Sequence, residues 1–115
     1  MLFRSFVRPQ DSVWYTSSRL PIVAYSATAG GYFAGRGHDS ALYSDPVNKG
    51  RYDRALQLAT EIDFTPGQIA LAWLRNQPAT VIPLFGTTDR QHLSEAIGSV
   101  DVVLSPEEVK WLYDG

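Results

Sequence analysis

The sequence of 115 residues contains no cysteine and no large excess of charge of either sign. The absence of cysteine excludes disulfide frameworks, thiolate zinc sites and cysteine nucleophiles, and it is typical of a cytoplasmic protein. The formal net charge is -2 without a dense basic stretch, which argues against nucleic acid or an anionic membrane surface as a partner. No apolar run approaches the roughly 18–20 residues of a membrane span, and the first eight residues lack the features of a signal peptide. These absences predict a soluble protein.

Histidine is scarce, which limits the chemistry that the sequence can support. His38 and His92 lie more than fifty positions apart, so the usual spacing of metal ligands does not occur. No serine stands in a Gly-x-Ser-x-Gly elbow. The sequence therefore predicts neither a metal site nor a serine nucleophile.

The residues that are present are typical of a folded domain. The chain is 44% hydrophobic and 19% charged, and its length suits one domain or a part of one. Hydrophobic periodicity and turn residues predict alternating helices and strands. The expected elements are the end of a helix over 10–18, a strand over 22–25, a long loop over 27–48, a helix over 51–62, a helix from 66 that stops at Pro78, a strand over 79–85, a helix led by Thr88 that ends at Gly98, and a helix from 106.

Capping signals mark several of these helix starts. Thr65 and Ser105 are each followed by proline and, three positions on, by Gln68 and Glu108, which is the capping-box pattern. Thr88 is expected to cap the helix between them. The stripe formed by positions 69, 70, 73 and 74 predicts that the helix after Thr65 lies against a sheet. The three tryptophans are expected to be packing residues: Trp14, Trp73 and Trp111.

The order of strands and helices predicts an α/β fold with a parallel sheet covered on both faces. The apolar run over 22–25 fits such a strand, although a buried helix segment gives the same pattern. Parallel strands end at a common edge, so the loops after Tyr25 and Pro83 should meet where parallel sheets bind ligands. Two strands alone leave both sheet edges unpaired, which predicts part of a larger sheet, and marginal folding or association through the open edges.

The segment after the second strand could bind an anion. Gly86 allows close approach of a ligand to the backbone, Thr87 and Thr88 offer hydroxyl groups, and the amides that follow open a helix whose positive end favours phosphate. The alternative, which the pattern alone favours, is that Gly86 only makes a turn and Thr88 only caps the helix. Arg90 and His92 lie on the first turns of that helix.

A glycine-rich stretch after the first strand, "AYSATAGGYFAGRG" over 24–37, is a second phosphate candidate. It combines glycines with the hydroxyl groups of Ser26 and Thr28 and the charge of Arg36. Its glycines do not follow the Gly-x-Gly-x-x-Gly spacing at the start of a helix, so it is not a Rossmann signature. A loop made of small residues without a ligand is the alternative.

Four segments, taken in order, resemble the aldo-keto reductases. They are "LPIVAYSATAGGYFAGRG", "TPGQIALAWLRNQP", "VIPLFGTTDRQHLSEAIG" and "LSPEEVKWL". Residues from about 20 to 115 resemble the C-terminal portion of that family, and the first twenty residues resemble the helix that precedes it. The resemblance implies that 1–115 is a single partial domain of a (β/α)8 TIM barrel, which carries its last two strand-helix units with strands seven and eight.

The resemblance also implies a site for a nicotinamide dinucleotide, NADP(H) or alternatively NAD(H). In this site Tyr25 stacks on the nicotinamide. Ser26, Thr28, Gly30 and Arg36 surround the pyrophosphate, Gly86, Thr87 and Thr88 meet the adenosine phosphate, His92 stands where the family often has arginine or glutamine, and Glu95 lies near the adenine.

The sequence departs from the family pattern at two positions of this site. Asp89 stands where a basic residue is common, and Ala96 replaces a frequent asparagine that binds adenine. A carboxylate beside a 2′-phosphate repels it, so the preference for NADP over NAD is an open question.

The family's catalytic aspartate, tyrosine, lysine and histidine come from earlier strands, and the resemblance places none of them in these 115 residues. The chain alone is therefore expected to be inactive, and a small aldehyde or ketone is expected as substrate only in a complete barrel. The rival hypotheses are a non-catalytic interaction module that completes a partner's barrel, and a small α/β domain that binds an unrelated phosphate ligand.

Overall fold

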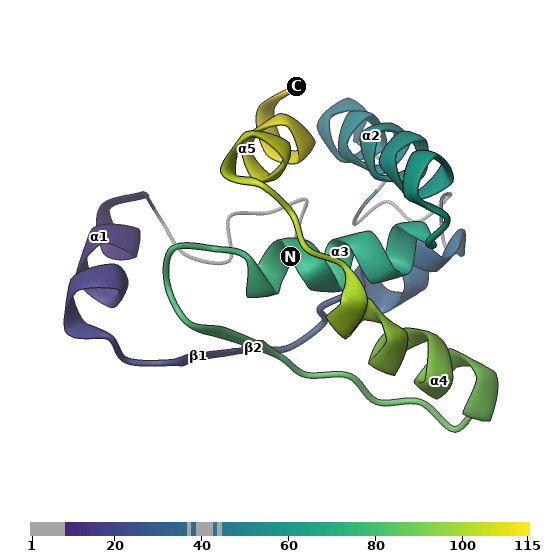
Figure 1. Ribbon diagram of the computed structural model, residues 1–115, viewed down its shortest axis with the longest axis horizontal. Helices are drawn as coiled ribbons and strands as arrows, with labels where there is room; N and C mark the ends of the chain where they lie inside the picture. The colour runs from purple at the N-terminus through teal and green to yellow at the C-terminus, as the bar shows by residue number, and fades with distance from the viewer. Residues whose placement is uncertain (1–8, 37, 39–42, 44) are drawn as a thin grey trace.

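The structure is a computed structural model, and it describes residues 9–36, 38, 43 and 45–115 (Figure 1). The described part is an α/β arrangement in which two parallel strands lie beside a layer of helices. Its elements are α1 (Pro9–Ser18), β1 (Ile22–Ala24), the 3-10 helix η1 (Ala29–Ala34), α2 (Pro46–Ile62), α3 (Pro66–Arg75), β2 (Val81–Pro83), α4 (Arg90–Gly98), the 3-10 helix η2 (Ser99–Asp101) and α5 (Pro106–Asp114). The α/β class and the end of a helix before the first strand are confirmed.

The strands pair in parallel, as predicted, with Val23 opposite Ile82. Because side chains alternate between the two faces of a strand, Ala24 and Val81 are buried beneath the helices, whereas Val23 and Ile82 are 55% and 49% exposed. The prediction that both faces of the sheet are covered is therefore wrong for the described residues. Helices cover one face (Figure 1), and covering the other would require further elements.

Helix α3 is the centre of the core. Thr65 caps it through a complete capping box with Gln68, as predicted. The apolar positions of the predicted stripe are all buried, and so are Leu71 and Ala72 on the remaining turns. A helix that is apolar nearly all round is an interior helix. It contacts the second strand, α2, η1, α4 and η2, so it lies against the sheet as expected and connects the other elements.

The long loop predicted over 27–48 is partly wrong. It contains η1, and α2 begins at Pro46 rather than near Arg51. Asp45 caps α2 by accepting from the amides of Val47 and Asn48 at 2.9 and 3.0 Å. The pair Asp45-Pro46 is the same cap-and-proline signal as at Thr65, but the asparagine and glycine that follow mask the helix in the sequence. Residues 37, 39–42 and 44 of the predicted loop lie outside the described residues.

The start of α4 is also shifted. Asp89, not Thr88, is the cap, and it accepts from the amides of Gln91 and His92. Gly98 does not end the helix in a left-handed conformation, because its φ is -61° and the chain continues directly into η2. The predicted start of α5 is confirmed, with a capping box between Ser105 and Glu108.

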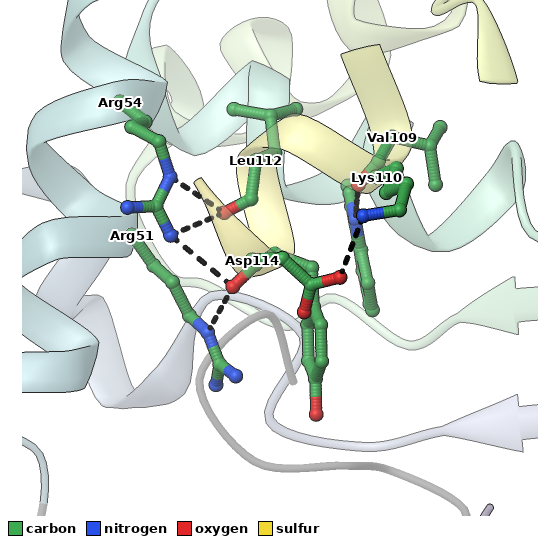
Figure 2. A network of polar contacts seen from close by, with 8 residues as sticks. Arg51, Arg54, Val109, Lys110, Leu112 and Asp114 are labelled. Carbon is green, nitrogen blue, oxygen red and sulfur yellow. Dashed lines mark hydrogen bonds and ion pairs between the residues drawn. The ribbon is translucent and has the colours of Figure 1, made fainter. Parts of the chain in front are cut away.

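Helix α2 holds the last turn of α5 through two arginines (Figure 2). Arg51 donates to the carbonyl oxygen of Tyr113 at 3.0 Å, and its guanidinium lies 3.9 Å from the centre of the Tyr113 ring. Arg54 donates to the carbonyl oxygens of Leu112 and Tyr113. Partial burial lowers the pKa of Arg54, and the neighbouring Arg51 lowers it further. The two cations occupy the end of α5, where the helix dipole is negative.

Helix α1 lies to one side of the other helices (Figure 1). Trp14 on this helix is 55% exposed, so the prediction that it is a packing residue is wrong for this structure, while Trp73 is buried as expected and Trp111 is partly buried. Among the described residues, no helix combines the length and the apolar character needed to span a membrane.

Candidate functional site

The loops that follow the two strands leave the sheet at the same edge, as predicted. The amide of Leu84 donates to the carbonyl oxygen of Ala24 at 2.8 Å, which joins the chain at the ends of both strands. A cleft of about 280 Å³ opens between the loops. Its lining residues are Ser26, Ala27, Thr28, Gly30, Gly31, Arg36, Leu84, Phe85, Gly86, Thr87 and His92. The cleft thus gathers glycines, hydroxyl groups and a guanidinium from two separate segments of the chain.

The loop after β1 has a strained backbone. Ser26 and Ala29 have φ values of 51° and 54°, in the left-handed region that residues with a side chain rarely adopt. The amide of Ala29 donates to the carbonyl oxygen of Ser26 at 2.9 Å, and the amide of Gly31 donates to that of Thr28 at 3.2 Å. Each such conformation costs on the order of 1–3 kcal/mol and is found mainly at functional sites. Of these two residues, Ser26 lines the cleft.

Arg36 lies across this loop because Gly31 leaves space for it. A Cβ atom on Gly31 would stand 3.1 Å from Arg36 Nε, and the φ of Gly31 is 94°. The amide of Arg36 donates to the carbonyl oxygen of Gly31 at 3.0 Å. Arg36 is exposed, so its charge is available to an anion in the cleft.

The loop after β2 is open toward the cleft. An added Cβ on Gly86 would meet no heavy atom within 4 Å, and the φ of Gly86 is not in the left-handed region. Neither the backbone conformation nor packing within the described residues requires glycine here. The hydroxyl of Thr87 accepts from the amide of Asp89 at 3.1 Å, so it helps to shape the start of α4.

The start of α4 differs from the anion-binding site that the sequence suggests. The carboxylate of Asp89 already accepts from the amides of Gln91 and His92 at 2.8 and 3.1 Å. These two hydrogen bonds, from His92 first, lower the pKa of Asp89, and the positive charge of Arg36 lowers it further. The chain's own carboxylate therefore occupies amides that were expected to face a phosphate.

A second, smaller cavity of about 30 Å³ lies beside the cleft. It is lined by Thr28, Ala34, Arg36, Gly67, Gln68, Leu71, Phe85, His92, Glu95 and Ala96. Three residues, Thr28, Arg36 and His92, belong to both cavities. A volume of this size holds about one water molecule, so a larger group could lie only across its mouth.

The structure brings most of the predicted site residues together. Seven line the larger cleft, namely Ser26, Thr28, Gly30, Arg36, Gly86, Thr87 and His92, and Glu95 lines the smaller cavity. Tyr25 and Thr88 line neither cavity; Tyr25 stands at the end of β1 with 73% of its surface exposed, and Thr88 is also exposed.

A model of the aldo/keto reductase family matches residues 15–113. The chain belongs to this family. It is similar to "Probable aldo-keto reductase 1" of Glycine max, with 34% identity over 107 residues that cover 81% of this chain and 31% of the relative. It is also similar to "Versiconal hemiacetal acetate reductase" of Aspergillus parasiticus, with 34% identity over 65 residues, 56% of this chain and 19% of the relative. The chain thus spans less than a third of the length of these relatives.

Aldo/keto reductases are (β/α)8 barrels that bind a nicotinamide dinucleotide and carbonyl substrates. The resemblance seen in the four sequence segments is thereby confirmed. In a barrel of this kind the ligand site lies at the carboxyl ends of the strands, which is where this chain of the family opens its cleft.

Local sequence patterns do not mark several of the residues that line the two cavities. Leu84 and Phe85 fit the apolar run of the predicted strand, although Phe85 lines both cavities. Gln68 fits a capping box and also lines the smaller cavity. The position of each of these side chains depends on tertiary packing, which no local pattern specifies. The described residues contain no group of three or more His, Cys, Asp or Glu side chains arranged to hold a metal ion.

Proposed function

We propose that residues 1–115 form the cofactor-side end of an aldo-keto-reductase barrel, in which β1 and β2 are strands seven and eight. The observation that carries this proposal is the cleft itself. Two segments that are far apart in the sequence, 26–36 and 84–92, place glycines, hydroxyl groups and Arg36 around one opening at the carboxyl ends of parallel strands. Backbone and side-chain donors around a cationic centre suit the phosphates of a dinucleotide.

The proposed roles follow the arrangement of the two loops. Tyr25, exposed beside the cleft, offers its ring face to the nicotinamide. The pyrophosphate is assigned to Ser26, Thr28, Gly30 and Arg36. The adenosine phosphate is assigned to Gly86, Thr87 and Thr88, and the adenosine end of the cleft to His92 and Glu95.

The type of dinucleotide depends on Asp89. Its carboxylate is ionised at neutral pH, as aspartate ordinarily is, and it caps the start of α4, close to the proposed adenosine end. A 2′-phosphate there would meet a like charge, which costs affinity. Of the two dinucleotides used by the family, NADP(H) and NAD(H), we propose that NADP(H) loses part of its usual advantage in this chain.

For the complete barrel we propose reduction of a small aldehyde or ketone. When bound, the dinucleotide supplies the hydride for the carbonyl carbon, and the carbonyl oxygen takes a proton from an acid. No residue of this chain is proposed as that acid, because the cleft residues serve the cofactor. The chain by itself is thus proposed to bind but not to catalyse.

Titration of the full 115-residue chain with NADPH and NADH, followed by nucleotide fluorescence, tests the proposal. Saturable binding of either nucleotide is expected, with inorganic phosphate as a much weaker competitor. Equal competition by inorganic phosphate would favour the rival small phosphate-binding domain. A concentration of about 1 mM nucleotide would detect even a weak site. No detectable binding at that concentration would contradict the proposal that the chain binds a dinucleotide.

A second candidate function is a barrel-completing interaction module, favoured by the open face of the sheet. Val23, Tyr25, Ile82 and Leu84 expose between 49% and 73% of their surface on or beside the strands. The two strands also pair only with each other among the described residues. An exposed apolar face with open edges favours addition of further strands. Light scattering should show self-association, or thermal unfolding followed by circular dichroism should be broad. A strict monomer with a sharp cooperative melt would contradict this candidate.

A further inference from the structure

Helix α4 carries the adenosine end of the proposed site but has little packing of its own. None of its nine residues, all of which the structure describes, is buried. Leu93 and Ile97 are 46% and 61% exposed. Burial of apolar surface therefore contributes little to the position of this helix, although His92 and Glu95 on it line the cavities.

Polar contacts from the first turn of α3 hold α4 instead. The Thr65 hydroxyl donates to Glu95 Oε1 at 2.8 Å. The side-chain amide of Gln68 donates to the backbone carbonyl oxygen of Glu95, also at 2.8 Å. A hydrogen bond to a carboxylate is about twice as strong as one between neutral groups. The capping box of α3 thus fixes both the backbone and the side chain of one residue on α4.

Two glycines give these contacts their space. A Cβ on Gly67 would stand 3.4 Å from Glu95 Oε1, and one on Gly98 would stand 2.9 Å from Gln68 Nε2. The Thr65 hydroxyl makes two hydrogen bonds. Its Oγ1 accepts from the amide of Gln68 at 3.2 Å, and it donates to Glu95 Oε1. The arrangement is more than a helix cap, since a cap needs no partner on another helix.

We propose that Thr65 and Gln68 are positioning residues of the nucleotide site, which hold Glu95 and the first turns of α4 at the wall of the cavity. The inference rests on the proposed function. It assigns to the start of α3 a role in the affinity for the adenosine portion of the ligand. Thr65 lines neither cavity and acts only through Glu95, whereas Gln68 lines the smaller cavity and also holds the backbone of Glu95.

Double-mutant cycles on stability test the contact without any ligand. Urea unfolding of the full chain is compared for wild type, Thr65→Val, Glu95→Ala and the double variant. We expect the two changes to be non-additive by about fivefold in the folding equilibrium constant. The control cycle pairs Ser105→Ala with Glu95→Ala, because Ser105 makes the same capping box on α5 without a bond to Glu95. That control should be additive.

Binding of ADP, measured by calorimetry, tests the positioning role. Thr65→Val should weaken binding about five- to tenfold, as expected for losing a residue that orients a ligand-contacting group. Thr65→Ser keeps the hydroxyl group and should bind ADP as tightly as wild type. Ser105→Ala loses a comparable helix cap and should also bind ADP as wild type does. In the Glu95→Ala background, Thr65→Val should have no further effect.

The outcomes separate this inference from the proposed function. Wild-type chain that binds no ADP defeats the proposed function, and the stability cycle then still decides whether Thr65 and Glu95 are coupled. ADP binding that is unchanged in Thr65→Val, or weakened equally in Ser105→Ala, overturns the positioning role. An additive stability cycle overturns the coupling itself.

Discussion

Helices α3 and α4 both carry residues that line the smaller cavity, yet they are held in place by different forces. Seven of the ten residues of α3 are buried, and its apolar side chains contact the sheet and α2. Helix α4 has no buried residue, and hydrogen bonds from the start of α3 hold it at Glu95. Arg75 at the end of α3 holds the chain just after α4. Packing thus fixes the scaffold, while polar contacts fix the element that carries part of the site.

Because different forces hold the two helices, the site can vary while the fold stays constant. Packed interiors resist small changes in volume, so α3 has little freedom to change. A helix held by a few hydrogen bonds can shift when one of them changes, and the residues that it presents to a ligand shift with it. Removing a packed side chain should therefore lower the free energy of unfolding more than removing a polar contact does.

The largest effect is expected in α3. Leu74 is fully buried, and Leu74→Ala should lower the free energy of unfolding by about 2–5 kcal/mol. Leu93→Ala on α4, where the side chain is 46% exposed, should change it by about 0.5 kcal/mol. Urea unfolding of both variants checks the difference. Equal losses at the two positions would show that α4 is packed more firmly than the structure indicates.

A smaller effect is expected where α3 holds the far end of α4. Arg75 donates to the carbonyl oxygens of Ser99 and Val102, which follow α4 in the chain. Arg75→Met keeps the aliphatic stem but removes these bonds, and it should cost about 1.5–3 kcal/mol. The matched change on the exposed Arg90, Arg90→Met, should leave the free energy of unfolding nearly unchanged. Thermal unfolding of the two variants measures the difference, and similar losses in both would contradict the prediction.

A change of a few fold is expected in the choice of nucleotide. Asp89→Asn keeps a good helix cap while removing the negative charge at the start of α4. The ratio of NADPH to NADH affinity should therefore rise by roughly three- to tenfold, since two charges about 4 Å apart in water interact with an energy on the order of 1 kcal/mol. Fluorescence titrations of both proteins at low salt check this. An unchanged ratio would place the 2′-phosphate away from Asp89.

The smallest effect concerns pH. Because hydrogen bonds from His92 and Gln91 lower the pKa of Asp89 in the folded chain, its ionised form stabilises the fold above the ordinary aspartate value of about 3.9. That contribution is lost as the pH falls through the lowered value. The stability difference between wild type and Asp89→Asn should thus shrink below about pH 4. Urea unfolding between neutral and acid pH measures it, and a difference that stays constant would contradict the role of the charge.

The sequence predicts those parts of the fold that local chemistry determines. The capping boxes at Thr65 and Ser105 are confirmed, because each depends on residues within one turn. The end of α2 and the parallel pairing of the strands are also confirmed. The start of α4 was misplaced by one residue, since Thr88 and Asp89 are both capable caps and tertiary position decides between them. The exposed side of the sheet could not be predicted, because coverage depends on elements beyond these strands.

The candidate site was predictable in its location more than in its details. The parallel order alone placed both loops at one edge, and the cleft lies there. The occupied amides at Asp89 and the bond between Thr65 and Glu95 were not foreseen. Both involve side chains that act across loops or helices, so they follow from three-dimensional placement, which spacing along the chain does not contain.

The hydrogen bonds from α2 to the end of α5 have a practical consequence for labelling the protein. Arg51 and Arg54 bind main-chain oxygens 58 to 62 positions later, so changing the side chains of Leu112 or Tyr113 leaves these acceptors in place, whereas displacing the backbone does not. A Cβ on Gly115 would already stand 3.2 Å from Arg54 Nη1. A side chain at position 115 would therefore crowd the Arg54 guanidinium. A tag that displaces the backbone of the last turn would break the hydrogen bonds of both arginines, and a flexible spacer after Gly115 avoids that displacement.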